Sequence, residues 1–315
     1  MPKKPHLLIV SNFHLPTIQL LDEQYTTHKL WPIKDKAERQ ALLESIAPEC
    51  TAMATFHFAN AKMLNTLTNL KMIASFGVGT DGIDFGITNA RNILVSNTPD
   101  VLNDEVADLA LALILATQRQ IVQADKFVRD GRWLDGQMPF GRGLAGKTLG
   151  VMGLGRIGQA IAERALACKM NIAYHNRQQK NVPYRYCENF VELAKVSDIL
   201  LNVLPSTEAT AQIVNKEVLQ ALGSNGTFIN IGRGDTVDQD ALINALQNNV
   251  IAGAGLDVYV NEPKVPEELI ALPNVVLTPH IGSATFETRA AMGKLVIDNL
   301  EAFFNGRPLL TPVTS

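Results

Sequence analysis

The sequence predicts an α/β protein built from parallel sheets, and three observations support this prediction. Short apolar or β-branched runs alternate with longer helical patterns along the chain, an order typical of strand–helix–strand units. A glycine-rich turn at residues 153–158 joins one such run to a helical pattern. The length of 315 residues is comfortable for two domains, and a composition that is 46% hydrophobic and 19% charged suits globular units with substantial cores.

The expected strands fall into two groups, separated by a helix. In the first half of the chain, strands are predicted near residues 7–10, 51–55, 72–76 and 93–96. In the second half they are predicted near residues 148–152, 172–175, 199–204, 227–231, 251–257 and 275–278. Between the groups, one extended helix is predicted from about residue 103 to residue 130, with Asn103 or Asp104 as its cap.

Three further segments can be placed from local patterns. Residues 109–116 are apolar nearly all round, which predicts that this part of the helix is buried between domains or against another subunit. Residues 132–146 are rich in glycine and include Pro139, so we expect a loop or arm there. The last helix is expected to start near Ser283, a plausible cap, and to end before Gly306.

Composition and charge argue against several classes of partner. A net charge of -3 gives no indication of a nucleic-acid surface. No apolar run approaches the roughly 20 residues of a membrane-spanning helix, and the N-terminal run is too short for a signal peptide. The three cysteines have no paired spacing, which favours free thiols in a reducing compartment. We therefore expect a cytoplasmic protein with no membrane or nucleic-acid partner. No metal site is expected either, because the five histidines other than His280 have no metal-ligand spacing: His6, His14, His28, His57 and His175.

Two loops match the pattern G-x-G-x-x-G, and their context distinguishes them. The second, GLGRIG, lies between the strand-like TLGVM and the helical QAIAERALACKM, where backbone N–H groups can approach a phosphate at a helix N-terminus. The first, GVGTDG at residues 77–82, contains Asp81, with Asp84 just beyond, and carboxylates there would repel a pyrophosphate. The first loop could still bind a small anion through its backbone donors. The predicted cofactor-binding residues of the second loop are Gly153, Leu154, Gly155, Arg156, Ile157 and Gly158.

The end of the next strand predicts which dinucleotide is preferred. An NAD site places an acidic residue there to accept hydrogen bonds from the ribose hydroxyl. Here the strand runs into His175, Asn176 and Arg177, and no Asp or Glu occurs between residues 171 and 187. A 2′-phosphate needs cations and hydrogen-bond donors. Asn176 and Arg177 therefore predict a preference for NADP(H), with NAD(H) possible, although a solvated basic turn would look the same.

Three polar residues follow strands in the second half: Arg233 in NIGRGD, Glu262 in LDVYVNEP and His280 in LTPHIGS. With FGVGTDGID and NTPDVLNDEVADLALALILA, they resemble the D-isomer-specific 2-hydroxyacid dehydrogenases over about residues 50 to 308. Within that family, the likeness is nearest to NADPH-using glyoxylate/hydroxypyruvate and hydroxyphenylpyruvate reductases. The resemblance implies reduction of a small 2-oxo acid to the D-2-hydroxy acid.

The resemblance assigns roles that suit these residue types. His280 would donate a proton to the carbonyl oxygen, and Glu262 would orient the ring and favour its protonated form. Arg233 would bind the substrate carboxylate with its planar fork and polarise the carbonyl. The backbone donors of Val78 and Gly79 would form a second clamp on that carboxylate. The remaining implied cofactor contacts are Leu204, Pro205, Ile231, Asp257 at the nicotinamide carboxamide, and Gly282.

The family pattern also implies the architecture. We expect two Rossmann/flavodoxin-like, doubly wound parallel-sheet domains with the active site in the cleft between them. Residues 99–283 would form the NAD(P)-binding domain, and residues 1–98 with 284–315 the substrate-binding domain. A homodimer is expected, in which Met138 or Phe140 of the arm is the candidate to reach the partner's pocket.

Other functions remain open at this stage. Phosphite and 3-phosphoglycerate dehydrogenases share the fold, although the latter often carry an extra regulatory domain. Formate dehydrogenases lack an acidic partner for the histidine, so Glu262 argues against that activity. A corepressor-like module that senses NAD(P)H would keep the same residues, and only an assay of turnover would distinguish it.

Overall fold

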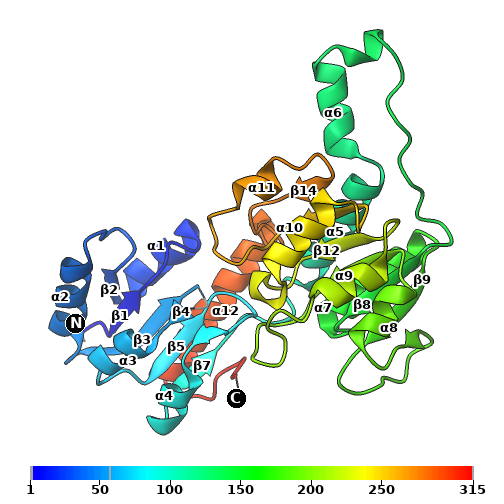
Figure 1. Cartoon of the computed structure of the whole chain (residues 1–315). Coiled ribbons are helices and arrows are strands. Elements are labelled where there is room, and N and C mark those ends of the chain that lie inside the picture. Colours follow the sequence, from blue (N-terminus) through cyan, green and yellow to red (C-terminus); the bar gives the residue numbers. More distant parts are fainter. Residues whose placement is uncertain (1–2, 57, 314–315) are drawn as a thin grey trace. The chain divides into compact units, whose positions relative to one another are not determined.

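The computed structural model describes residues 3–56 and 58–313, so His57 lies outside the described residues. The chain divides into two compact units. The first comprises Met1–Leu102 and Ala284–Ser315, and the second comprises Asn103–Ser283 (Figure 1). Each unit is built around its own parallel sheet, which confirms the predicted fold class.

The sheet of the first unit has the strand order β2-β1-β3-β5-β7 among the described residues, and all its pairings are parallel. The chain starts at β1, adds β2 on one side, and then adds β3, β5 and β7 on the other side, so the order reverses between β1 and β3. The strands are β1 (His6–Ile9), β2 (Thr26–Lys29), β3 (Cys50–Thr55), β5 (Met72–Ser75) and β7 (Leu94–Ser96), with a separate pair β4 (Phe58–Ala59) and β6 (Gly82–Ile83). The helices are α1 (Leu15–Gln24), α2 (Lys36–Ile46), α3 (Ala61–Thr66), α4 (Phe85–Ala90) and α12 (Phe286–Phe304).

The sheet of the second unit has the order β10-β9-β8-β11-β12-β13-β14, again with parallel pairings throughout the described residues. Here the order reverses between β8 and β11. The strands are β8 (Thr148–Met152), β9 (Asn171–His175), β10 (Arg185–Tyr186), β11 (Ile199–Asn202), β12 (Thr227–Asn230), β13 (Gly253–Leu256) and β14 (Val275–Leu277). The helices are α5 (Asn103–Gln118), α6 (Ile121–Arg129), α7 (Arg156–Ala167), α8 (Phe190–Lys195), α9 (Lys216–Leu222), α10 (Gln239–Gln247) and α11 (Glu267–Ile270), with short 3₁₀ turns at Arg132–Leu134 and Gly234–Thr236.

The central strands of both sheets are buried on both faces. Every residue of β5, β11, β12 and β13 is buried, and these strands read as continuous apolar runs rather than alternating ones. Their cores come from helices packed against the sheet: Leu43, Met63 and Leu64 in the first unit, and Leu193, Leu219 and Leu242 in the second.

The prediction of one extended helix over residues 103–130 is wrong, because the helix is interrupted between α5 and α6. Gln120 has a left-handed backbone with φ of 54°. The carbonyl of Gln118 accepts the N–H of Arg142 at 2.7 Å, and the buried Gln118 amide donates to Thr227 at 2.8 Å. These two bonds hold the end of α5 while the chain turns away. Within the single chain 37% of Leu115 is exposed, so the burial of this apolar stretch against another subunit stays a prediction.

The ends of the last helix also depend on side-chain chemistry. Its cap is Thr285 rather than the predicted Ser283, because the Thr285 hydroxyl accepts the N–H of Thr288 at 3.1 Å. The helix ends before Gly306, which has φ of +64°, as expected for a C-terminal stop. Among the described residues, no helix combines the length and the apolar character needed to cross a bilayer.

Two histidines face each other across β1 and β2. His28 Nε2 lies 3.0 Å from His6 Nδ1, and the other ring nitrogen of His6 lies 3.0 Å from a Glu49 oxygen. Burial lowers the pKa of His28, and the charge of a protonated His6 lowers it further, while Glu49 partly offsets both. The folded protein therefore favours a neutral His28.

We predict that the free energy of unfolding falls as the pH drops below about 6.5, the ordinary pKa of histidine. In that range the unfolded chain binds a proton that folded His28 resists, so acid favours unfolding. Urea unfolding between pH 7.5 and 5.5 measures this slope. His28→Gln keeps a hydrogen-bonding group that does not titrate, so it should flatten the slope. An equal slope in the variant would contradict the assignment.

Candidate active site

The second glycine loop lies where β8 passes into α7, at the reversal point of its sheet. Gly153 has φ of +99°, in the left-handed region that favours glycine. A Cβ on Gly158 would lie 2.3 Å from the carbonyl oxygen of Gly153, so only glycine lets α7 start this close to the turn. A Cβ on Gly155 would meet no heavy atom within 4 Å. The fold itself thus does not require glycine at 155, and the space beside it is open.

The neighbouring strand braces this loop. Asn176 Oδ1 accepts the N–H of Leu154 at 2.7 Å, and the carbonyl of His175 accepts the N–H of Gly153 at 3.1 Å. The amide oxygen of Asn176 therefore shapes the loop, while Arg177 beside it is exposed. An open turn at the start of a twelve-residue helix, without an acid in the first turn, fits the pyrophosphate of a dinucleotide.

The predicted lining residues after β11 and β12 lie next to this loop. Leu204 Cδ2 lies 3.0 Å from the position of a Cβ on Gly153, so Leu204 and Pro205 follow β11 directly beside the glycine turn. Gly232, which follows Ile231, packs against the backbone of Leu204, where a Cβ would come within 2.7 Å of its carbonyl oxygen. These ends of adjacent parallel strands meet at one edge of the sheet.

A buried polar network, which the sequence reasoning missed, holds the backbone beside Arg233. The Asn202 amide donates to Asn230 at 3.0 Å and to Thr236 at 2.7 Å. Asn230 and Thr236 in turn donate to the carbonyl of Arg233 at 3.1 and 2.6 Å. The signal was present in the sequence, since ILLN and TFIN each end an apolar strand with asparagine.

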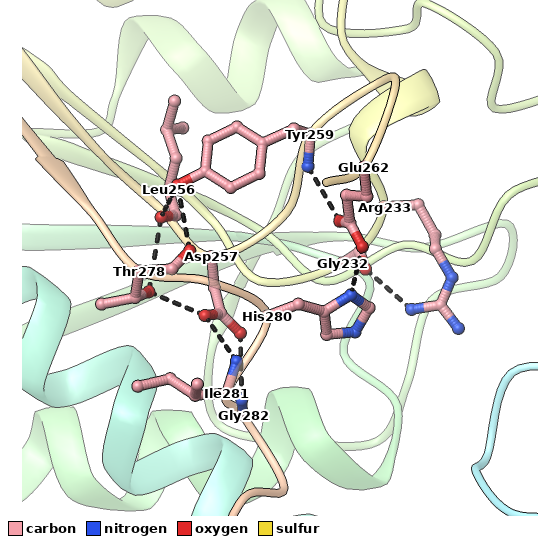
Figure 2. A network of polar contacts seen from close by, with 10 residues as sticks. All are labelled: Gly232, Arg233, Leu256, Asp257, Tyr259, Glu262, Thr278, His280, Ile281 and Gly282. Carbon is pink, nitrogen blue, oxygen red and sulfur yellow. Dashed lines mark hydrogen bonds and ion pairs between the residues drawn. The ribbon is translucent and has the colours of Figure 1, made fainter. Parts of the chain in front are cut away.

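His280 and Glu262 are hydrogen-bonded (Figure 2), with His280 Nδ1 2.7 Å from Glu262 Oε2. The other carboxylate oxygen accepts the N–H of Tyr259 at 3.0 Å. Burial alone would raise the pKa of Glu262. The hydrogen bonds from His280 and Tyr259, with the charges of His280 and Arg233, outweigh burial and bring that pKa below its usual value. Glu262 is thus ionised at neutral pH and oriented toward the imidazole.

Close packing of two loops brings Arg233 to this pair. Gly234 lies against the backbone of Tyr259, where a Cβ would come within 2.0 Å of the Tyr259 carbonyl carbon. The loop after β12 therefore contacts the loop after β13 without any intervening side chain. Arg233 Nη1 donates to the carbonyl of Gly232 at 2.9 Å. The structure brings together the three residues predicted to do the chemistry (Figure 2).

Asp257 holds the loop that carries His280. Only 2% of Asp257 is exposed, and its carboxylate accepts the Thr278 hydroxyl at 2.7 Å and the N–H groups of Ile281 and Gly282 at 2.9 and 3.0 Å. Its backbone carbonyl accepts the N–H of His280 at 2.9 Å. This side chain was predicted to contact nicotinamide, and that role stays a prediction. Its anchoring of the loop was not foreseen.

The first glycine loop belongs to the first unit. The Asn97 amide donates to the carbonyl of Val78 at 2.9 Å, and the N–H of Thr98 donates to the carbonyl of Gly77 at 2.9 Å. Within the described residues, no acceptor takes the N–H of Val78 or Gly79. The loop is therefore held by its carbonyls and presents donors, which suits the predicted anion contact.

Two further predictions concern the side chains of the arm and metal binding. In the arm, 93% of Phe140 is exposed and Met138 is half-buried. Among the described His, Cys, Asp and Glu residues, no group is arranged to hold a metal ion.

Comparison with known proteins places the chain in a family. Residues 111–282 match the model of the "D-isomer specific 2-hydroxyacid dehydrogenase, NAD binding domain". The chain is 46% identical to glyoxylate/hydroxypyruvate reductase A of Arabidopsis thaliana, over 93% of this chain and 94% of the relative. It is also 46% identical to hydroxyphenylpyruvate reductase of Plectranthus scutellarioides, over 94% of both.

A solved structure agrees over both units. The NADPH-dependent glyoxylate/hydroxypyruvate reductase of Sinorhizobium meliloti, in complex with NADP and malonate, superposes with a TM-score of 0.93 and 42% identity. The match covers 99% of this chain and 97% of that one. The likeness inferred from the motifs is confirmed: the chain belongs to the D-isomer-specific 2-hydroxyacid dehydrogenases, a family of NAD(P)-dependent oxidoreductases.

Proposed function

We propose that this protein reduces a small 2-oxo acid to the D-2-hydroxy acid with NADPH. The substrate is glyoxylate, hydroxypyruvate or a larger 2-oxo acid such as an aryl pyruvate. The observation that carries the proposal is the His280–Glu262 pair next to Arg233, in the unit that also holds the open glycine cradle. When bound, the nicotinamide cofactor supplies the hydride that reduces carbon 2.

The protein's own groups complete that reduction. His280, protonated and paired with Glu262, donates a proton to the carbonyl oxygen as the carbon accepts the hydride, so the aldehyde or ketone becomes an alcohol. Arg233 binds the substrate carboxylate and polarises the carbonyl, since its planar fork matches a carboxylate. The N–H groups of Val78 and Gly79 bind the same carboxylate. The carboxylate of Glu262 lies 2.7 Å from His280 Nδ1, which orients the imidazole and assigns proton donation to its other ring nitrogen.

The cofactor is held by the cradle and by the turn after β9. Residues 153–158 bind the pyrophosphate, and Arg177 binds the 2′-phosphate that distinguishes NADPH from NADH. Asn176 contributes to the same turn, and Leu204, Pro205, Ile231, Asp257 and Gly282 line the remainder of the cofactor site. NADH is accepted less well, because no acidic residue at the end of β9 would hold its ribose hydroxyl.

The domain roles and the assembly belong to the same proposal. The second unit, Asn103–Ser283, acts as the nucleotide-binding domain, and the first unit acts as the substrate-binding domain; the first boundary lies after Leu102 rather than after residue 98. The protein is a cytoplasmic homodimer. Figure 1 shows α6 and the arm standing out from the body of the second unit. Three apolar side chains there are 69, 93 and 93% exposed: Trp133, Leu134 and Phe140. A second copy of the chain would cover them.

The proton donor is tested by His280→Ala. A well-placed general acid is worth about 10²–10⁴-fold, so turnover of a 2-oxo acid should fall by that factor. Binding of NADPH, followed by fluorescence titration, should change little because His280 lies outside the cradle. Turnover close to that of the wild type would refute the assignment.

The role of Glu262 is tested by Glu262→Gln. A hydrogen bond to a charged group contributes about 1.5–3 kcal/mol, so losing the carboxylate that holds His280 should lower turnover of a 2-oxo acid about 10- to 100-fold. The Kd for NADPH should change little, because Glu262 lies outside the cradle. Steady-state rates and fluorescence titration of NADPH measure the two effects. Turnover equal to that of the wild type would show that the carboxylate does not position His280.

Cofactor choice is tested by Arg177→Gln. A hydrogen bond to a charged group contributes about 1.5–3 kcal/mol, so the Kd for NADPH should rise about 10- to 100-fold. The Kd for NADH should stay the same because it lacks the 2′-phosphate. Equal weakening of both cofactors would show that Arg177 does not read that phosphate.

A further inference from the structure

A cluster of aromatic rings and one arginine lies at the reversal point of the first sheet. Phe13 and His14 follow β1, Phe56 follows β3, and Phe76 follows β5. The rings of Phe13 and Phe76 stack at 4.7 Å, and those of Phe56 and Phe76 are 6.0 Å apart. The carboxyl ends of strands at a reversal point are where open α/β sheets bind ligands. This cluster therefore occupies a ligand-binding position of its own unit.

Arg289, from the first turns of α12, is the cation of this cluster. Its Cζ lies 5.4 Å from the centre of the Phe56 ring and 5.5 Å from that of Phe76. The side chain is half-buried, and in the described part of the chain no acceptor takes a hydrogen bond from the guanidinium. The rings thus orient a cation whose planar donors remain unused.

The surroundings of Arg289 leave its charge uncompensated. Burial lowers the pKa of Arg289, with no anion among the described residues to offset it. His14 lies nearby, with Nδ1 2.8 Å from the Thr17 hydroxyl. Burial and the charge of Arg289 both lower the pKa of His14, so the imidazole is neutral at neutral pH. The cluster therefore carries the single positive charge of Arg289.

Position along the chain connects this cluster to the substrate loop. Phe76, on which Arg289 lies, is followed directly by Gly77, Val78 and Gly79. We expect the N–H groups of Val78 and Gly79 to hold the substrate carboxylate. Because one residue separates Val78 from Phe76, the cluster around Phe76 is then close enough to contact the rest of the same small molecule. A partly desolvated guanidinium with unused donors is suited to a hydroxyl or carboxylate there.

We propose that Arg289 is a specificity-determining residue that binds a polar substituent beyond carbon 2 of the substrate. Phe56, Phe76 and His14 form the walls of this subsite. The enzyme then favours 2-oxo acids with a hydroxyl or carboxylate on carbon 3 over those in which carbon 3 is an unsubstituted methyl group. This inference rests on the proposed reductase function.

Hydroxypyruvate and pyruvate test the subsite, because they differ only in the hydroxyl on carbon 3. In Arg289→Met, kcat/KM for hydroxypyruvate should fall about 10- to 100-fold, mainly through KM, while kcat/KM for pyruvate stays within about twofold. Lys294→Met removes an exposed charge from the same helix, where Lys294 pairs with Asp298, and should behave as the wild type. Thermal unfolding of each variant checks that the fold is kept.

Each outcome bears on a separate claim. Equal loss with both substrates, or no loss with either, would overturn the subsite while the reductase function stands. A wild type that reduces no 2-oxo acid would overturn the proposed function and the subsite with it. If Arg289→Met does not fold, Arg289→Lys decides, because it keeps the charge and loses the planar fork. A ratio of the two kcat/KM values unchanged from the wild type in that variant would also overturn the subsite.

Discussion

The carboxylate of Asp257 holds the backbone of His280 in an unusual conformation, and the geometry of the active residues depends on that interaction. His280 has φ of 53°, a left-handed backbone that few residues other than glycine adopt. Asp257 accepts bonds from residues on both sides of it, Thr278 before and Ile281 and Gly282 after. Tyr259 also anchors this loop, because its hydroxyl donates a hydrogen bond to the Thr278 carbonyl at 2.9 Å. The loop is thereby over-determined, and its strain is tolerated.

The same physical constraint, that parallel strands end at a common edge, explains why residues distant in sequence work together. β8, β11, β12 and β13 deliver the glycine cradle, Leu204, Arg233 and Asp257 to one edge of their sheet. Two contacts that only glycine permits then complete the site: Gly158 lets α7 start against the turn at Gly153, and Gly234 brings the loops after β12 and β13 into direct backbone contact. The sheet thus places the functional residues at one edge, and the absence of a side chain at these glycines lets the backbone segments that carry them come into contact.

What could be predicted from the sequence was mainly what is encoded locally. Apolar runs identified the central strands, and the glycine spacing identified the cradle, because both signals reside in a few adjacent residues. The polar edge strand β2, TTHK, has no such signal. The break after Gln118 depends on Arg142, and the anchoring by Asp257 depends on residues 278–282. Hydrogen bonds between residues far apart in the sequence leave no local pattern. Arg233, Glu262 and His280 are also far apart, and they could be predicted together because they resemble the motifs of a known family.

The bond between Gln118 and Arg142 closes the base of the intervening segment, and the Gln123 amide ties α6 back to the domain by donating to the carbonyl of Pro273 at 2.7 Å. Arg142 is tied there a second time, since its guanidinium donates to the backbone of Asn225. The side chains of Trp133, Leu134 and Phe140 are exposed and take no part in these bonds. Natural selection, or an engineer, can therefore exchange them with little effect on α5 and β8, so relatives with nearly identical interiors can diverge in how they associate.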